Sequence, residues 1–288
     1  MKIVIIGAGN VGANLHHAFE LKGINAELVH ARPLLDVEDP IGGILPQADV
    51  YIYTVIDDAL AEVAQHVNAP KSLHLHTSGT IPVSIFGEDK PHAGVIYFLQ
   101  SFSKVSLIDD WSGIPCFVDG RNIDDIAAIY SLAQTLTSRI YEANQHDRER
   151  LHIAGVFANN YTNLMYRMAA EVLKDTQIPF EALLPLIDQT ATKVHTLTPK
   201  AAQTGPAARG DGEVVMHHAE LLGNVSKGEF FPSDMQFLYL NMARMIQDSN
   251  RPETERQSID DILSRALEAS IETTQNHLIP STRRRRRR

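Results

Sequence analysis

Short apolar runs recur through the first half of the chain and are separated by polar or helically spaced segments. Their β-branched and aromatic residues predict strands at 2–6, 26–30, 49–55, 72–76, 94–98, 114–118 and 138–142. Apolar spacing typical of helices predicts helices at 13–22, 59–67 and 123–137. Because strands alternate with helices, the pattern predicts an α/β fold, with a doubly wound and mostly parallel sheet of the Rossmann type.

The pattern changes near Gln145, where strand signals end and long helical segments begin. Apolar spacing predicts helices at 147–175, 179–198, 211–226, 233–248 and 255–277, with proline or glycine near the breaks between them. We therefore expect a sheet domain at 1–145, an all-helical domain at 146–277 and a disordered arginine-rich tail at 278–288.

Composition predicts a globular protein of the cytoplasm. Hydrophobic residues make up 44% of the chain and charged residues 21%. No apolar run approaches the roughly 18 residues that a membrane span needs, and the apolar start is too short for a signal peptide. The single cysteine, Cys116, excludes an intrachain disulfide and favours a reducing compartment.

The charge balance argues against a nucleic-acid partner. Net charge is −9, and it becomes −15 when the six arginines at 283–288 are left out, with 20 basic against 35 acidic residues. That arginine block is either a polyanion-binding tail or an addition to the native chain. The 13 histidines lack the spacing of a metal site, and no Gly-x-Ser-x-Gly elbow marks a serine hydrolase.

A glycine-rich turn joins the first strand to the first helix. It reads Gly7, Ala8, Gly9, Asn10, Val11, Gly12, which is Gly-x-Gly-x-x-Gly with a strand before it and a helix after it. In this geometry Gly7 makes the tight turn, Gly9 lets the backbone approach a pyrophosphate, and Gly12 lets the helix pack closely on the sheet. The motif predicts a dinucleotide cofactor at the helix N-terminus; a glycine-rich turn without a ligand is the alternative.

The end of the second strand indicates which dinucleotide is bound. In proteins that bind NAD, a carboxylate about 20 residues after the glycines holds the ribose hydroxyls. Here the strand ends in His30, Arg32 follows, and the first acid is Asp36, beyond a proline. A guanidinium pairs with a 2′-phosphate, which a carboxylate would repel. We therefore expect NADP(H), contacted by His30 and Arg32; the alternative is that Arg32 is a solvated loop residue.

Further candidates follow the other strands, because parallel strands present their carboxyl ends at one edge of the sheet. The cofactor-contacting candidates at these ends are Thr54, Val55, Ile56, Thr77, Ser78 and Gly79. Gln100 follows the strand at 94–98 and is a candidate for the reacting end of the site.

The first helix of the helical domain carries a polar stripe. At about 100° per residue, one sector of this helix collects His152, Val156, Asn159, Asn160, Asn163 and Arg167. Asparagine is a poor former of helix interiors, so its clustering on one face needs a reason. We interpret the stripe as substrate-facing, with Asn159 and Asn160 orienting a carbonyl or carboxylate and His152 donating a proton. A polar contact between helices or subunits is the alternative.

A polar segment at 204–211 lies between two predicted helices. It reads Thr-Gly-Pro-Ala-Ala-Arg-Gly-Asp, and its glycines and proline define a loop backbone. Its arginine, Arg209, either binds a substrate carboxylate or pairs with Asp211.

The chain up to about residue 275 resembles the proteins described as Rossmann-like with a domain of unknown function 2520. The resemblance rests on the segments 7–12, 76–79, 97–103, 111–115, 156–161 and 204–211, of which the last is the most specific. Family members often read His-Pro-Leu-Gln-Thr-Phe where this chain has Tyr-Phe-Leu-Gln-Ser-Phe at 97–102. The resemblance implies a nucleotide-binding domain and a helical domain that forms a homodimer. It implies no particular substrate.

The wider 6-phosphogluconate-dehydrogenase-like group, which includes pyrroline-5-carboxylate reductase, offers a negative test. Hydroxyacid dehydrogenases of that group place a lysine four residues before an asparagine on the interdomain helix. At that spacing this chain has Val156 before Asn160 and Gly155 before Asn159, so the lysine is absent. An imine-type reduction, or one assisted by His152, is therefore favoured if the protein is catalytic.

Two functions remain open. The first is an NADP(H)-dependent oxidoreductase that reduces a small carbonyl or imine substrate in a cleft between the domains. The candidate residues of that cleft are Gln100, His152, Asn159, Asn160 and Arg209. The second is a non-catalytic protein that binds or senses NADP. The absent lysine favours the second function, and the polar stripe favours the first.

Overall fold

The computed structural model describes residues 1–37 and 40–250, which fall into two compact units. The first unit is Met1–Tyr161, and the second begins at Thr162. The helix predicted at 255–277 and the tail predicted at 278–288 lie outside the described residues. Within the described part, no helix is long and apolar enough to cross a membrane.

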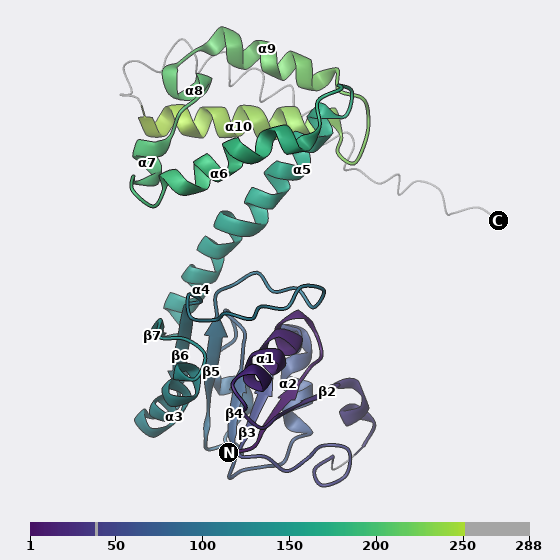
Figure 1. The fold of residues 1–288 in the computed structure, drawn as a ribbon, viewed down its shortest axis with the longest axis vertical. Helices are drawn as coiled ribbons and strands as arrows, with labels where there is room; N and C mark the ends of the chain where they lie inside the picture. The colour runs from purple at the N-terminus through teal and green to yellow at the C-terminus, as the bar shows by residue number, and fades with distance from the viewer. Residues whose placement is uncertain (38–39, 251–288) are drawn as a thin grey trace, which may run out of the picture. The chain divides into compact units, whose positions relative to one another are not determined.

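The first unit is built on a sheet of seven strands (Figure 1). These are β1 (Ile3–Ile6), β2 (Ala26–Val29), β3 (Val50–Tyr53), β4 (Leu73–His76), β5 (Ala93–Phe98), β6 (Cys116–Gly120) and β7 (Ile140–Glu142). They lie in the order β2-β1-β3-β4-β5-β6-β7. Strands β1 to β5 are parallel, β6 is antiparallel to β5, and β7 is parallel to β6. The predicted doubly wound, mostly parallel sheet is confirmed.

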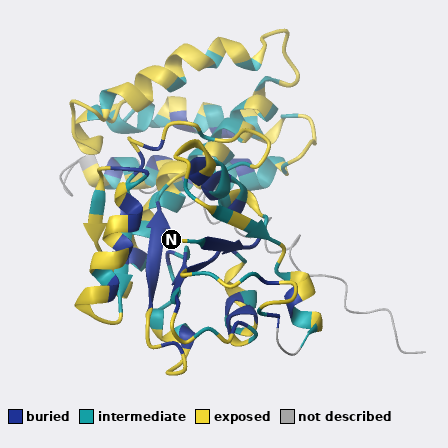
Figure 2. Ribbon diagram, turned by 60° about the horizontal axis from the view of Figure 1, so that its bottom comes forward, coloured by how far each residue is buried: buried dark blue, intermediate teal, exposed yellow. Residues whose placement is uncertain are grey.

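Alternate residues of each strand face opposite sides of the sheet, and both sides are apolar. One side is covered by the helices α1 (Asn10–Leu21) and α3 (Ile123–Gln134). The other side is covered by α2 (Asp57–Gln65) and by the 3-10 helices η1 (Arg32–Asp36) and η2 (Val83–Phe86). The strands β1, β3 and β5 between these layers are wholly buried (Figure 2).

Two histidines of β4 are buried in the sheet. His74 packs against Phe86, and its Nδ1 atom is hydrogen-bonded to the Tyr53 hydroxyl at 2.9 Å. His76 also packs against Phe86, and its Nδ1 atom accepts the Ser78 N–H at 3.2 Å. Burial lowers the pKa of both rings from 6.5 to about 4, so both are neutral at pH 7.

Because the buried rings of His74 and His76 are neutral, we expect the free energy of unfolding to decrease at acidic pH. Because they titrate near 6.5 in the unfolded chain and near 4 in the fold, the unfolded state binds protons that the fold excludes. The free energy of unfolding therefore keeps this contribution above pH 6.5 and loses it as pH falls towards 4. The loss amounts to about 2 kcal/mol per histidine between pH 7 and 5.

Urea unfolding at several pH values, followed by the fluorescence of Trp111 in the core under α1 and α3, measures the effect on the whole unit. In the double variant His74→Gln, His76→Gln, the free energy of unfolding should depend much less on pH. The variant His146→Gln, which changes an exposed histidine, should retain the dependence of the wild type. If the wild type, the double variant and His146→Gln all show the same pH dependence of stability, His74 and His76 are not its cause.

The long helix predicted at 147–175 is interrupted in the structure. It consists of α4 (Gln145–Gly155), a π-helical segment η3 (Val156–Tyr161) and α5 (Thr162–Leu173). The boundary between the two compact units follows η3, whereas the change of sequence pattern predicts a boundary near residue 145. π-Helical turns are rare and occur frequently at functional sites.

The second unit is helical, as predicted. Besides α5 it contains η4 (Phe180–Leu183), α6 (Leu184–Lys193), α7 (Pro199–Ala202), α8 (Pro206–Arg209), α9 (Gly212–Gly223) and α10 (Pro232–Asn250). Its buried cluster joins Val215 and Ala219 of α9 to Leu240 and Ala243 of α10. The segment at 204–211, which was expected to be a loop, contains the one-turn helix α8.

Candidate functional site

The glycine-rich turn at 7–12 packs tightly between β1, β3 and α1. Gly7 has a φ of 120°, a conformation that favours glycine. A side chain at Gly12 would place its Cβ 1.9 Å from the Gly7 carbonyl oxygen. The Thr54 hydroxyl donates to that same oxygen at 2.7 Å and ties the end of β3 to the turn. Only glycine fits at position 12 without moving the backbone of the turn.

The N-terminus of α1 offers a surface for phosphate. Gly9 is the N-cap residue and has no side chain that could cap the first turn. A Cβ added at Gly9 would meet no atom within 4 Å, so the space in front of the turn is open. The N–H groups of the first turn carry the positive end of the helix dipole. Open space and uncapped donors at one point fit the pyrophosphate of a dinucleotide.

A cavity of about 290 Å³ lies beside this turn. Six of the predicted cofactor-contacting residues line it: Val11, Thr54, Val55, Thr77, Ser78 and Gly79. Ile56, which was also predicted, is 74% exposed and is not among the lining residues. Asp57, at the same strand end as Thr54, lines it as well, and so do four residues that sequence reasoning did not select: Thr80, Tyr97, Phe98 and Phe102.

Asp57 holds the cavity wall that follows β4. Its Oδ2 atom accepts hydrogen bonds from the hydroxyls of Ser78 (3.0 Å) and Thr80 (2.8 Å). The Ser78 hydroxyl accepts in turn from the N–H groups of Thr80 and Ile81 at 3.1 and 3.2 Å. Because Asp57 opens α2, these bonds fix the turn at 77–81 to the start of a helix.

His30 and Arg32 both follow β2, at its carboxyl end. Both side chains are exposed, and Arg32 is the first residue of η1. This placement suits contact with the ribose end of a dinucleotide that lies across the glycine-rich turn. Which group Arg32 contacts stays a prediction.

A second cavity, of about 250 Å³, adjoins the first. The two cavities share Tyr97, Gln100 and His152. The second one is also lined by Leu99, Ser101, Gly155, Val156, Ala158, Asn159 and Asn160. The structure therefore brings together four of the five residues that the sequence singled out for the reacting end, and it adds Tyr97.

Tyr97 and Gly79 fix the position of the His152 ring. The Tyr97 hydroxyl and the His152 Nδ1 atom are 3.1 Å apart. A Cβ at Gly79 would lie 3.0 Å from that same nitrogen, so the turn after β4 packs directly on the imidazole. Burial raises the pKa of Tyr97 above its usual value of 10, which keeps the phenol protonated.

The predicted polar stripe is divided. His152, Val156, Asn159 and Asn160 line the second cavity, from α4 and η3. Asn163 and Arg167 belong instead to α5 of the second unit, where Arg167 forms an ion pair with Glu229. Because a π-helical turn holds more residues than an α-helical turn, the regular spacing assumed for the stripe does not continue through η3.

Buried Asn14 holds the segment after β5 against α1. Its Nδ2 atom donates to the Ser103 carbonyl at 3.0 Å, and its Oδ1 atom accepts the Ile108 N–H at 3.0 Å. Gln100 begins this segment, and its side chain accepts the Ser101 N–H at 2.8 Å. The helix of the glycine-rich turn therefore also positions a wall that both cavities share.

Arg209 lies in the second unit, at the end of α8. Its Nε atom donates to the Asp211 carboxylate at 2.9 Å, which is one of the two alternatives that the sequence left open. A contact of Arg209 with substrate stays a prediction. In the part of the chain that the structure describes, no group of His, Cys, Asp and Glu side chains is arranged to hold a metal ion.

A family model and a solved protein structure both match this chain. The family described as domain of unknown function 2520 matches residues 114–246. A solved protein of Bacteroides fragilis, proposed to be an NADP oxidoreductase, is 37% identical and has a TM-score of 0.75. That match covers 86% of this chain and 98% of the Bacteroides chain. No curated protein matches the chain.

Imine reductases share the fold at low identity. The enzyme of Streptomyces aurantiacus is 12% identical with a TM-score of 0.58, over 86% of this chain and 96% of that one. The enzyme of Myxococcus stipitatus, solved with NADP⁺, is 11% identical with a TM-score of 0.52, over 96% and 95%. These two likenesses concern the fold alone. The identity and coverage of the Bacteroides protein go further, and the chain belongs to the Rossmann-like family that carries the domain of unknown function 2520.

Proposed function

We propose that this protein is an NADP(H)-dependent oxidoreductase that reduces a small carbonyl or imine compound. The observation that carries the proposal is the pair of adjoining cavities, which share Tyr97, Gln100 and His152. One cavity adjoins the glycine-rich turn, and the other is lined by carboxamides of η3. This arrangement suits a reaction in which the cofactor and its substrate meet at one polar wall. The description of the Bacteroides relative supports the same class.

His152 is the residue that we assign to proton donation. A bound nicotinamide supplies hydride, so reduction also requires a proton. The His152 Nδ1 atom is engaged by Tyr97, which leaves Nε2 to donate. Transfer of that proton from the protonated ring to the nitrogen or oxygen of the substrate leaves a neutral imidazole and completes an amine or alcohol. Tyr97 stays protonated because burial raises its pKa, and it holds the ring during the transfer.

The remaining polar residues of the second cavity orient the substrate. Asn159, Asn160 and Gln100 offer amide donors and acceptors without a charge. Val156 lines the same cavity at the spacing where the hydroxyacid dehydrogenases have lysine, so we favour an imine over a hydroxyacid as the substrate class.

The choice of NADP(H) over NAD(H) is tested with Arg32→Ala. A charge-assisted pair with the 2′-phosphate contributes about 1.5 to 3 kcal/mol, so its loss should lower the preference for NADPH over NADH about 10- to 100-fold. The ratio of the two dissociation constants is the quantity to measure. Arg139→Ala, which removes an exposed arginine just before β7, is the control and should keep the ratio. An unchanged ratio in the Arg32 variant removes the argument for NADP.

Oxidation of NADPH against a panel of imines, aldehydes and keto acids tests the oxidoreductase itself. Turnover of at least one compound, strongly reduced in a His152 variant, is the expected result. Tight binding of NADPH without turnover of any compound in the panel would instead favour the sensing protein.

We also propose that the second unit forms a homodimer. Neither α5 nor α6 has a buried residue, whereas Leu184, Leu186 and Val194 are between 45% and 64% exposed. A second copy of the chain is the occupant that family resemblance favours for such an apolar surface. Sedimentation equilibrium tests this proposal, and a mass equal to one chain at micromolar concentration would contradict it.

A further inference from the structure

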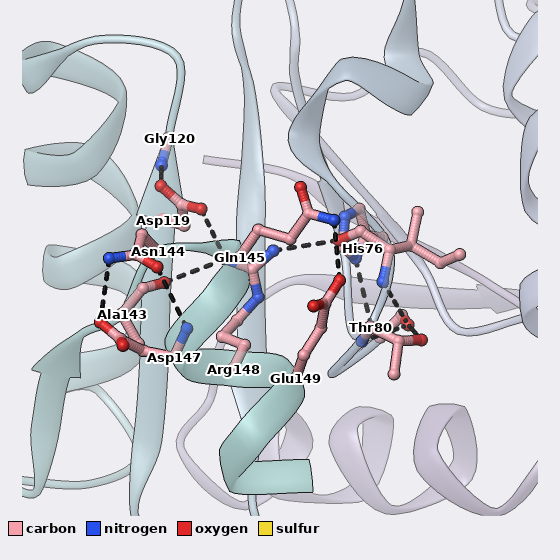
Figure 3. Close-up of polar contacts among 12 residues, drawn as sticks. His76, Thr80, Asp119, Gly120, Ala143, Asn144, Gln145, Asp147, Arg148 and Glu149 are labelled. Carbon is pink, nitrogen blue, oxygen red and sulfur yellow. Dashed lines mark hydrogen bonds and ion pairs between the residues drawn. The ribbon is translucent and has the colours of Figure 1, made fainter. Parts of the chain in front are cut away.

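A fully buried arginine links α4 to three other segments of the first unit. The Arg148 side chain has no exposed surface. Its Nη1 atom donates to the Asp119 carboxylate of β6 at 2.5 Å and to the Ala143 carbonyl after β7 at 2.9 Å. Its Nη2 atom donates to the Ile81 carbonyl at 3.0 Å. Figure 3 shows the guanidinium between these strand ends and the turn that follows His76.

The Ile81 carbonyl belongs to the turn at 77–81. This turn forms a wall of the dinucleotide cavity, which is the cavity of about 290 Å³ beside the glycine-rich turn. The same turn touches α4 again where Gly79 packs on His152. Because Arg148 and His152 are four residues apart, both lie on the same side of the helix. The turn is therefore held to α4 at two successive points, by a charged hydrogen bond and by a close steric contact.

A contribution to stability alone does not explain why an arginine is buried at position 148. Burying a guanidinium is costly, and apolar residues of similar volume often replace a buried ion pair without loss of stability. An apolar side chain cannot, however, donate in fixed directions to three acceptors on three segments, which the planar guanidinium of Arg148 does. Its charge also adds to the effect of burial in lowering the pKa of His76, at the start of the same turn.

We propose that Arg148 is a positioning residue that fixes the turn at 77–81 and His152 in one arrangement, on which dinucleotide binding and proton donation both depend. Arg148 lines neither cavity, so it acts through the turn and through α4. The effect on His152 rests on the proposed function. The effect on the dinucleotide cavity does not rest on the proposed function, because NADPH binding is measured without a substrate.

The experiment compares Arg148→Met, Arg148→Lys and the control Arg150→Met, which changes an exposed arginine of the same helix. Dissociation constants for NADPH come from energy transfer between the nucleotide and Trp111. This residue is the single tryptophan of the chain, and it stacks on Phe102 of the cavity wall. Hydrogen exchange, followed by mass spectrometry, compares the turn at 77–81 with the strands β1 and β3. For any substrate found, kcat is measured as well.

In Arg148→Met, the NADPH dissociation constant should rise about 10-fold, the loss expected for one hydrogen bond from a charged donor. Exchange should increase in the turn while β1 and β3 stay protected, and kcat should fall further than KM rises. Lysine keeps the charge at Asp119 but cannot span Asp119 and Ile81 together, so Arg148→Lys should loosen the turn and restore only part of the affinity. It also provides the test if the methionine variant does not fold.

Three results overturn the proposal. The first is wild-type affinity and exchange in a folded Arg148→Met or Arg148→Lys protein. The second is an increase in exchange that is uniform over the whole sheet, because that would show a purely stabilising role. The third is an equal loss of affinity in Arg150→Met. If no substrate is turned over while the turn loosens and NADPH affinity falls as expected, the proposed oxidoreductase fails and the positioning role of Arg148 stands.

Discussion

Gly9→Ala should remove NADPH binding without destabilising the protein, whereas Gly12→Ala should lose both binding and stability. A methyl group at Gly9 enters open space, and φ of −82° there suits any residue, so the fold tolerates it. In the proposed complex, the pyrophosphate approaches the N-terminus of α1 through that open space. Losing two charge-assisted hydrogen bonds, at about 1.5 to 3 kcal/mol each, raises the dissociation constant roughly 100-fold or more.

At Gly12 the same methyl group meets the Gly7 carbonyl at 1.9 Å and the Thr54 hydroxyl at 2.6 Å. Relief requires a shift of backbone, and such overpacking costs about 1 to 3 kcal/mol of stability. Urea unfolding and NADPH titration separate the two effects. Gly113→Ala, at an exposed glycine with open space, should change neither quantity. If Gly9→Ala binds NADPH as tightly as wild type, the turn at 7–12 does not hold a pyrophosphate.

His152→Gln should lower kcat about 100- to 10,000-fold, the range for loss of a general acid. Glutamine can keep a hydrogen bond to Tyr97 and fill much of the space beside Gly79, but it cannot give up a proton. Binding of NADPH should change little, because the pyrophosphate and ribose contacts that we propose are at the glycine-rich turn and after β2. The expected signature is therefore a loss in kcat at nearly constant NADPH affinity.

Two further variants complete this test. His146→Gln removes an exposed histidine from the same helix and should leave kcat unchanged. Tyr97→Phe keeps the ring but removes the hydroxyl that engages Nδ1, so kcat should fall by less than in His152→Gln. Wild-type kcat in His152→Gln would show that the proton comes from another group or from water.

The sheet and the glycine-rich turn could be predicted from the sequence because their signals are local. The β-branched run at 2–6 and the glycines at 7, 9 and 12 are consecutive in the chain, and each residue type has one geometric use there. Gln100 could be placed at the site for a similar reason, because it follows a strand whose carboxyl end had to reach the same edge of the sheet.

Tertiary contacts explain what the sequence could not predict. Tyr97 and His152 are 55 residues apart, and no pattern within either segment indicates that they meet. The helix α4 is mostly polar, so nothing in its spacing marks Arg148 as the residue that is buried. The π-helical segment η3 also has no established signal in a single sequence. The polar stripe was predicted on the spacing of a regular α-helix, so η3 divides it.

If NADPH bound at the glycine-rich turn reduces a substrate in the adjoining cavity, the hydride from C4 of the nicotinamide must appear in the product. Reaction of the wild-type protein with NADPH deuterated at C4, followed by mass spectrometry of the product, tests this transfer. We predict one deuterium on the reduced carbon, delivered from only one of the two C4 diastereomers, and little or no labelled product with His152→Gln. A reduced product without deuterium, or tight NADPH binding with no deuterated product from any imine or carbonyl compound, would contradict it.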